Sequence, residues 1–189
     1  MKAVAFNGSA RKGGNTAVLL NIVLDRLSAE GVETELIELA GQNLSGCTAC
    51  YQCFENKDCV CVLKNDPING YIAKMQAADV ILLGSPTYFA DLSANMKALI
   101  ERCGMVSKAN NNFYRRKLGA AVVAVRRAGA YQVFNSLNSL FLIGEMIVVG
   151  SSYWNIGIGK DPGHVKEDQE GIQTMEKLGE NIAWLLNKM

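Results

Sequence analysis

The sequence predicts an α/β fold of three layers, in which helices cover both faces of a five-stranded parallel sheet with the strand order 2-1-3-4-5. Short apolar segments alternate with segments of helical periodicity along the 189 residues, as they do in a chain of βαβ units. Most of the short segments are apolar throughout, which is typical of strands buried on both faces. The length predicts a single domain over residues 1–189, with a cysteine-rich loop at about residues 44–66.

Each expected element has a local reason. Apolar runs that are bounded by turn residues predict strands at residues 3–6, 32–39, 80–83, 119–125 and 146–149. Apolar residues at helical spacing, or a proline in the first turn, predict helices at residues 16–30, 67–77, 93–103, 131–142 and 172–189. The first strand is wholly apolar and is placed at the centre of the sheet. The second strand alternates and is placed at an edge, whereas the fifth is expected to be the last of the central strands.

The composition excludes several classes of protein. Hydrophobic residues make up 49% and charged residues 20% of the chain, which argues against disorder. The net charge is +1, so there is no electrostatic case for nucleic acid or an anionic membrane as a partner. The most apolar stretch, Leu140 to Val149, contains Glu145 and is too short to span a bilayer. No targeting segment is visible, so we expect a cytoplasmic protein whose cysteines are reduced or bind metal.

The first expected strand runs into a glycine-rich loop, Asn7 to Thr16, that leads directly into a helix. Free N–H groups and the partial positive charge of a helix N-terminus suit a phosphate. Arg11 can add a charge-assisted hydrogen bond. The loop lacks the Gly-Lys-Ser/Thr of a Walker A loop and the Gly-x-Gly-x-x-Gly spacing of a dinucleotide fold. We interpret it as an anion-binding loop, and an ordinary capped turn is the alternative.

A second loop, Gly84 to Phe89, stands between a buried strand and the next helix. It combines a stiffening proline with two aromatic and two hydroxyl side chains, a mixture that suits a planar heteroaromatic ring. The alternative is that both aromatic side chains pack in the core. A third loop, residues 126–130, follows the next strand. In the predicted strand order the three loops meet at the carboxyl edge of the sheet, where ligands bind in such folds.

The first two loops together resemble the NADPH-dependent FMN reductase family of flavodoxin-like proteins. In that family the pattern Gly-Ser-x-Arg-x-x-Gly-Asn-Thr binds the FMN phosphate, and Gly-Ser-Pro-x-Tyr lies against the isoalloxazine ring. The sequence contains these patterns at residues 8–16 and 84–88, and the resemblance extends over nearly the whole chain. It implies a flavodoxin-like fold with bound FMN. The implied FMN-binding residues are Ser9, Arg11, Lys12, Gly14, Asn15, Thr16, Ser85, Pro86, Thr87, Tyr88, Phe89, Arg126 and Gly129.

Five of the six cysteines fall between residues 47 and 61, and the first three are separated by two residues each. Such spacing lets successive thiolates converge on one ion or cluster. The pattern resembles the compact cysteine motif of iron–sulfur flavoproteins, a branch of the same family. The resemblance implies that Cys47, Cys50, Cys53 and Cys59 ligate a [4Fe-4S] cluster, with Cys61 as a spare or replacement ligand.

Two other interpretations of the cysteines remain open at this point. Four thiolates can hold zinc, and the cysteines can equally stay reduced in a substrate-side or interface loop without metal. Cys103 lies on the apolar face of its helix and is expected in the core. His164, the one histidine, lies in a polar loop and is expected to be solvated, so no Ser-His-Asp or Cys-His arrangement is built on it.

The predicted function is that of an FMN-dependent oxidoreductase. NAD(P)H is the expected electron donor, and a small molecule or a protein is the expected acceptor. The flavin carries the chemistry, so no residue is assigned as a catalytic acid or base. With a cluster the role is electron transfer; without one it is reduction of a quinone, a free flavin or a small oxidised compound. The resemblance implies a homodimer or homotetramer. The alternative is a non-enzymatic nucleotide- or phosphate-binding module in which zinc is a structural clip.

Overall fold

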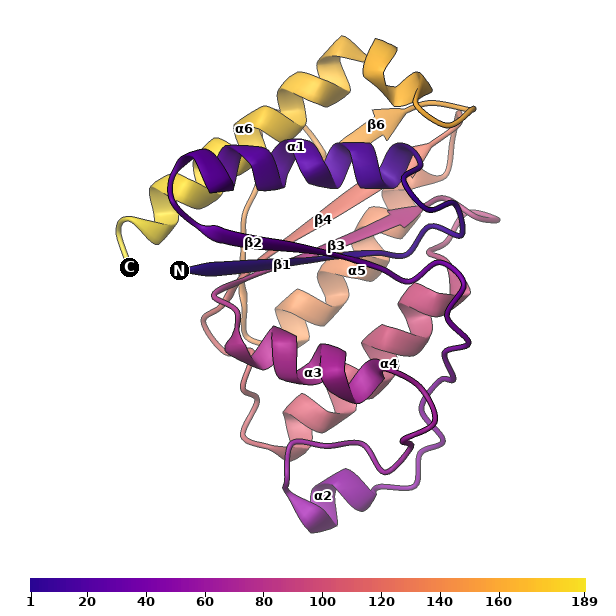
Figure 1. Ribbon diagram of the computed structural model, residues 1–189, viewed down its shortest axis with the longest axis vertical. Coiled ribbons are helices and arrows are strands. Elements are labelled where there is room, and N and C mark those ends of the chain that lie inside the picture. Colours follow the sequence, from indigo (N-terminus) through magenta and orange to yellow (C-terminus); the bar gives the residue numbers. More distant parts are fainter.

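A parallel sheet separates two layers of helices in the computed structural model, which describes residues 1–189 (Figure 1). The strands are hydrogen-bonded in the order β2-β1-β3-β4-β5, and β6 also pairs with β4. They span Lys2–Asn7 (β1), Glu33–Glu38 (β2), Val80–Pro86 (β3), Leu118–Val125 (β4), Ile147–Val148 (β5) and Ile156–Ile158 (β6). The predicted fold class and strand order are confirmed.

The burial of the strands follows their hydrophobic pattern. β4 is buried at every residue, and β1 and β3 are buried at all but one. β2, in which polar residues alternate with apolar ones, is largely half-exposed and forms an edge of the sheet. The centre of the sheet is therefore formed by the strands that the sequence shows as continuous apolar runs, because only these can be covered on both faces.

Helices α1 and α6 cover one face of the sheet, and α3, α4 and α5 cover the other (Figure 1). The α-helices span Asn15–Ala29 (α1), Gln52–Asn56 (α2), Ile68–Ala77 (α3), Ala94–Ala109 (α4), Ala130–Ile143 (α5) and Gln169–Leu186 (α6), and a short 3₁₀ helix spans His164–Glu167. Each face has its own apolar core, and the strands contribute alternate side chains to the two. None of the helices has the length and apolar character needed to cross a membrane.

The fifth strand position differs from the prediction. Residues 146–149 were expected to form the last central strand, but only Ile147 and Val148 pair, and they lie at an edge against the start of β4. β6 pairs with the end of β4. Asn155 stands between the two short strands: its backbone carbonyl accepts from Val123 N–H at 2.9 Å and its Nδ2 donates to the Ala121 carbonyl at 2.9 Å. Two short strands thus share one position, and the loop after β6 reaches the carboxyl edge of the sheet.

Candidate functional site

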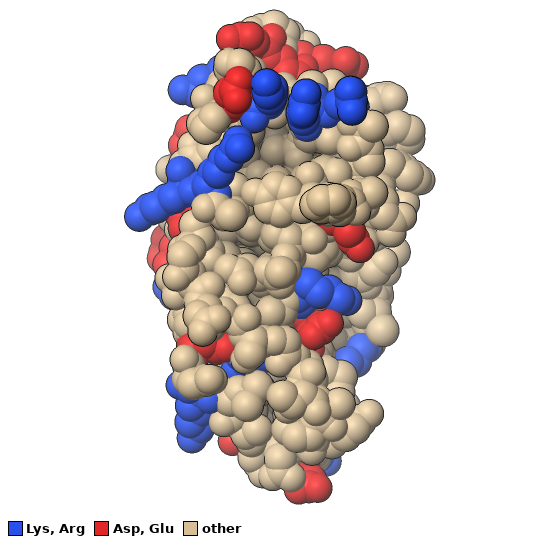
Figure 2. Space-filling view, turned by 90° about the vertical axis from the view of Figure 1, so that its right-hand side faces the viewer, with Lys and Arg blue, Asp and Glu red and all other residues tan.

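A pocket of about 260 Å³ lies at the carboxyl ends of β1, β3 and β4. Four loops contribute to it: the loop into α1, the loop after β3, the end of β4 with the residue that follows, and the loop after β6. Figure 2 shows Lys and Arg side chains gathered around a hollow on this face, above a largely uncharged surface. Arg11, Arg126 and Lys160 line the pocket together with one acid, Asp161. The local charge therefore favours an anion.

The first turn of α1 leaves free donors at the pocket. Gly14 is the N-cap residue and provides no side-chain cap, so the first N–H groups of the helix have no acceptor in the chain. Ser9 Oγ accepts from Arg11 N–H at 3.1 Å, which leaves the hydroxyl proton of this buried serine free to donate. The loop therefore presents unpaired N–H and O–H groups with the positive end of a helix dipole, which is the donor set of a phosphate site.

Two side chains outside the loop hold its shape. Glu38, at the end of β2, accepts from Gly13 N–H at 3.1 Å and from Asn7 Nδ2 at 2.6 Å. Asn15 Nδ2 donates to the Gly159 carbonyl at 3.0 Å, and its Oδ1 accepts from Gly163 N–H at 2.8 Å. The sequence indicated a phosphate contact for Asn15. In the structure its side chain joins the start of α1 to the loop after β6.

The loop after β3 forms the opposite wall. Thr87 N–H donates to the Ala124 carbonyl at 2.9 Å, but Thr87 Oγ1 is buried in the structure without any hydrogen-bond partner. Tyr88 pairs with Asp91 across a tight turn, whose residues Phe89 and Ala90 have φ angles of 48° and 63°. Tyr88 is 42% exposed and Phe89 is fully exposed, so the alternative that these aromatics pack in the core is wrong. A buried hydroxyl without a partner is uncommon and points to a ligand group that completes it.

The pocket gathers part of the predicted set. The predicted residues that line it are Ser9, Arg11, Asn15, Thr16, Pro86, Thr87, Tyr88 and Arg126, and those that do not are Lys12, Gly14, Ser85, Phe89 and Gly129. Gly14 and Gly129 are N-cap residues, of α1 and α5. Ser85 is fully buried, and its hydroxyl donates to the Pro86 carbonyl and accepts from Ser93 N–H. Ser85 therefore shapes the turn from behind.

Several lining residues were not predicted from the sequence, namely Ala124, Val125, Gly159, Lys160, Asp161 and Pro162. The last four follow β6, a strand that was not predicted. The short apolar run Ile156-Gly157-Ile158 before a polar Gly-Lys-Asp-Pro-Gly sequence is the signal that could have identified this fourth loop. It adds one cation and one carboxylate to the rim.

A small second cavity lies beside α4 and contains the cysteines. Cys47, Cys50, Cys53 and Cys61 line it, with a volume of about 20 Å³. Cys59 lies apart: its N–H donates to Asn110 Oδ1 at 3.1 Å and its Sγ accepts from Gln76 Nε2 at 3.7 Å. The structure thus brings together three of the four predicted ligands with Cys61. No three His, Cys, Asp or Glu side chains are arranged so that they could hold a metal ion.

The cysteines of this cavity differ in acidity. Hydrogen bonds from the Gln52 backbone and the Thr48 side chain lower the pKa of the exposed Cys50 thiol. Burial raises the pKa of the Cys53 thiol, and the neighbouring cysteines add to the increase. An exposed thiol of lowered pKa is the first to form a thiolate, the form that binds metal. The donor set therefore fits a thiolate-bound metal centre in its chemistry.

Two side chains outside the sites lie where the sequence placed them. Cys103 is fully buried in the core, and burial raises the pKa of its thiol to about 11. His164 is half-exposed, with Nδ1 3.8 Å from Asp161 Oδ2. Neither side chain lines the phosphate-type pocket or the cysteine cavity. The geometry therefore gives no histidine-based catalytic arrangement.

Comparison with known proteins identifies the family of the chain. Residues 1–161 match the NADPH-dependent FMN reductase family. An iron–sulfur flavoprotein of Methanocaldococcus jannaschii is 37% identical over 97% of this chain and 96% of its own length. One of Methanosarcina thermophila is 30% identical over 98% and 95%. The fold matches that of a flavodoxin from Archaea, with a TM-score of 0.64 at 17% identity over 99% of both chains. The chain therefore belongs to the NADPH-dependent FMN reductase family and, within it, groups with the iron–sulfur flavoproteins.

Proposed function

We propose that the protein is an FMN-dependent oxidoreductase that takes electrons from NAD(P)H. The observation that carries the proposal is the pocket in which uncapped N–H groups of α1, three cations and the unpartnered Thr87 hydroxyl face one space. These groups match the two ends of FMN. The α1 N–H groups and the cations are donors for the dianionic phosphate of FMN. The Thr87 hydroxyl lies beside the aromatic side chain of Tyr88, so it can form a hydrogen bond with the edge of a flat ring.

Each wall of the pocket has its own part in this proposal. Ser9, Arg11 and Thr16 bind the phosphate together with the α1 amides, and Lys12, Gly14 and Asn15 support that loop. Pro86, Thr87 and Tyr88 contact the ring, with Ser85 holding the turn and Phe89 extending it outward. Arg126 lines the wall after β4, and Gly129, which does not line the pocket, is the N-cap residue of α5. When bound, FMN supplies the hydride and single-electron chemistry, and the protein fixes the ring and its hydrogen bonds.

We further propose that Cys47, Cys50, Cys53 and Cys59 hold a [4Fe-4S] cluster, so that the protein passes single electrons from the flavin to a small-molecule or protein acceptor. The spacing of the cysteines, the cavity that Cys47, Cys50 and Cys53 share, and the iron–sulfur flavoproteins among the relatives support this proposal. Cys59 lies outside that cavity, so the proposal requires the segment to rearrange when the cluster binds. Reduced thiols are retained in the cytoplasm, which is the location that we propose.

A cofactor inventory of protein purified without oxygen tests both proposals. We expect a flavin absorbance spectrum with one FMN per chain, four iron atoms and four acid-labile sulfides per chain, and bleaching of the flavin by NADH or NADPH. A colourless protein that FMN cannot saturate contradicts the oxidoreductase proposal. Stoichiometric zinc without sulfide contradicts the cluster and favours the alternative in which zinc is a structural clip.

Replacement of single cysteines separates the two cofactors. We expect Cys50→Ser to abolish iron incorporation and to leave FMN bound, because Cys50 does not line the FMN pocket. Cys59→Ser and Cys61→Ser form a matched pair, in which only Cys59→Ser is expected to lose iron. Iron and flavin are measured in the same samples. Loss of both cofactors in Cys50→Ser contradicts the separation of the sites, and iron loss in Cys61→Ser alone moves the fourth ligand to Cys61.

A further inference from the structure

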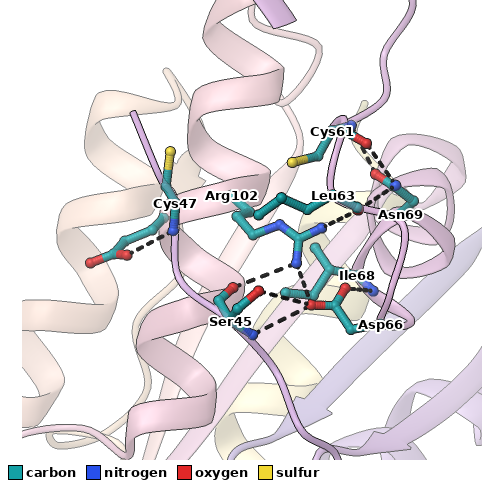
Figure 3. A network of polar contacts seen from close by, with 9 residues as sticks. Ser45, Cys47, Cys61, Leu63, Asp66, Ile68, Asn69 and Arg102 are labelled. Carbon is teal, nitrogen blue, oxygen red and sulfur yellow. Dashed lines mark hydrogen bonds and ion pairs between the residues drawn. The ribbon is translucent and has the colours of Figure 1, made fainter. Parts of the chain in front are cut away.

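Arg102 joins the two ends of the cysteine-rich segment. Its side chain is fully buried on α4. Its Nη1 donates to Asp66 Oδ2 and to the Ser45 carbonyl, the latter at 3.5 Å, and its Nη2 donates to the Leu63 carbonyl at 2.7 Å (Figure 3). Ser45 precedes the first cysteine of the segment, whereas Leu63 and Asp66 follow the last. One guanidinium therefore holds the two ends of the segment together.

The Asp66 carboxylate, which balances the charge of Arg102, accepts hydrogen bonds at both of its oxygens. Asp66 is also buried, and its Oδ1 accepts from Ile68 N–H at 3.1 Å (Figure 3). Its Oδ2 accepts from the Ser45 N–H and hydroxyl, both at 3.4 Å, as well as from Arg102. A buried ion pair is tolerated when hydrogen bonds satisfy its remaining atoms. The carboxylate meets this condition, and so do the two Nη atoms of the guanidinium.

Arg102 Nε is the exception. It is buried and has no hydrogen-bond partner in the structure. Arg102 is also the one charged residue among those that line the cavity with Cys47, Cys50, Cys53 and Cys61. A buried N–H without an acceptor is unfavourable, and arginine cannot remove it by losing the proton. The cavity that Arg102 lines is the place from which an acceptor can reach Nε, and cysteine sulfurs are the most numerous acceptors there, beside the hydroxyls of Thr48 and Tyr51.

We propose that Arg102 Nε–H donates a hydrogen bond to a sulfur of the iron–sulfur cluster, either cysteinyl or inorganic, and raises the reduction potential of the cluster. This inference rests on the cluster of the proposed function. Reduction adds negative charge to the cluster, so a fixed cationic donor stabilises the reduced state more than the oxidised one. Hydrogen bonds to the sulfurs are among the features that set the potentials of such clusters.

Arg102→Lys tests the inference, because lysine keeps the charge and has no atom equivalent to Nε. We expect the variant to retain four iron atoms per chain and to show a lower midpoint potential in an EPR-monitored redox titration. The expected size is about a tenfold change in the reduction equilibrium, which is about 59 mV for one electron. Arg26→Lys is the matched control, since Arg26 forms an exposed pair with Glu180 on the other face of the sheet, and its potential is expected to stay at the wild-type value.

A second measurement on the wild-type protein covers the case in which Arg102→Lys does not fold. Protein grown with ¹⁵N-arginine is reduced, and pulsed EPR is used to detect ¹⁵N coupled to the cluster; a coupling is expected, because Arg102 is the one arginine that lines the cysteine cavity. A loaded wild type with no coupling, or an Arg102→Lys variant with unchanged potential, overturns this inference and leaves the cluster in place. A wild type that binds no iron overturns the cluster and the inference together.

Discussion

Arg11 lines the pocket that we propose for FMN, and its side chain forms one hydrogen bond, from Nη1 to the Lys160 carbonyl at 3.3 Å. The rest of its guanidinium is free to form a charge-assisted pair with a phosphate. We expect Arg11→Ala to weaken FMN binding by about 1.5–3 kcal/mol, measured by fluorescence titration of FMN-free protein. Arg26→Ala removes an exposed arginine from the opposite end of α1 and is expected to leave the affinity unchanged. Equal affinities of Arg11→Ala and wild type contradict a phosphate contact.

Thr87 offers a separate measurement at the ring end of the pocket. Thr87→Val removes a buried hydroxyl that has no hydrogen-bond partner in the structure. We therefore expect the free energy of unfolding of FMN-free protein to stay the same or to rise, while FMN binding weakens by about 0.5–1.5 kcal/mol. Urea unfolding and FMN titration measure the two effects. Thr34→Val, on edge strand β2, is the control and leaves the FMN affinity unchanged; a Thr87→Val protein that loses stability but not affinity contradicts the assignment.

Among elements, α4 and the cysteine-rich segment are joined by the buried ion pair of Asp66 and Arg102, together with hydrogen bonds from Cys47 and Cys59. Burial by itself raises the pKa of the Asp66 carboxyl, but hydrogen bonds from Ile68, Arg102 and Ser45 outweigh burial and hold the pKa below its ordinary value of 3.8. Because the folded-state pKa is depressed, the contribution of Asp66 to stability is complete above pH 3.8 and is lost as the pH falls through the folded-state pKa.

We therefore expect Asp66→Asn to be less stable than wild type at neutral pH, and the difference to shrink as the pH falls below 3.8. Urea unfolding at a series of pH values measures this difference. Asp25→Asn, whose carboxylate forms no ion pair or side-chain hydrogen bond, is the control and is expected to follow the wild-type curve at all pH values. A difference between Asp66→Asn and wild type that stays constant down to pH 2 contradicts the mechanism.

Some of the elements could be predicted from the sequence and others could not. Central strands and the loops after β1, β3 and β4 followed from apolar runs ended by turn residues. β6 was not predicted, because its apolar run is only three residues long and its pairing with β4 depends on the Asn155 contacts. The spacing of the cysteines also did not predict that Cys61 lines the cavity and that Cys59 lies apart from it. Cys59 has a φ of 61°, and a left-handed residue turns the chain in a way that counting residues does not reveal.

At the scale of the whole molecule, one surface is unusually apolar. Leu142 and Ile143 on the last turn of α5 are 67% and 63% exposed, and Ile147 and Val148 of edge strand β5 follow directly. A groove of about 580 Å³ between α4, α5 and the cysteine-rich segment continues from Ile143. Neighbouring exposed apolar side chains are typical of an interaction site, and so is an edge strand with one free side. We propose that a second copy of the chain covers this surface in a homodimer or homotetramer.

Ile143→Lys places a charge at the junction of the groove and the exposed turn, so it is expected to weaken self-association by about 2 kcal/mol, or roughly thirtyfold in Kd. Light scattering with size-exclusion chromatography at micromolar concentration measures the change in mass. Trp184→Lys, a similarly exposed apolar position on α6 across the sheet, is the matched control and is expected to retain the wild-type mass. Thermal unfolding of both variants shows whether the fold is intact. A monomeric wild type contradicts the proposed assembly. If Ile143→Lys keeps the wild-type mass and Trp184→Lys dissociates, the interface lies on α6 and not on α5, because a charge is not tolerated at a side chain that the partner buries.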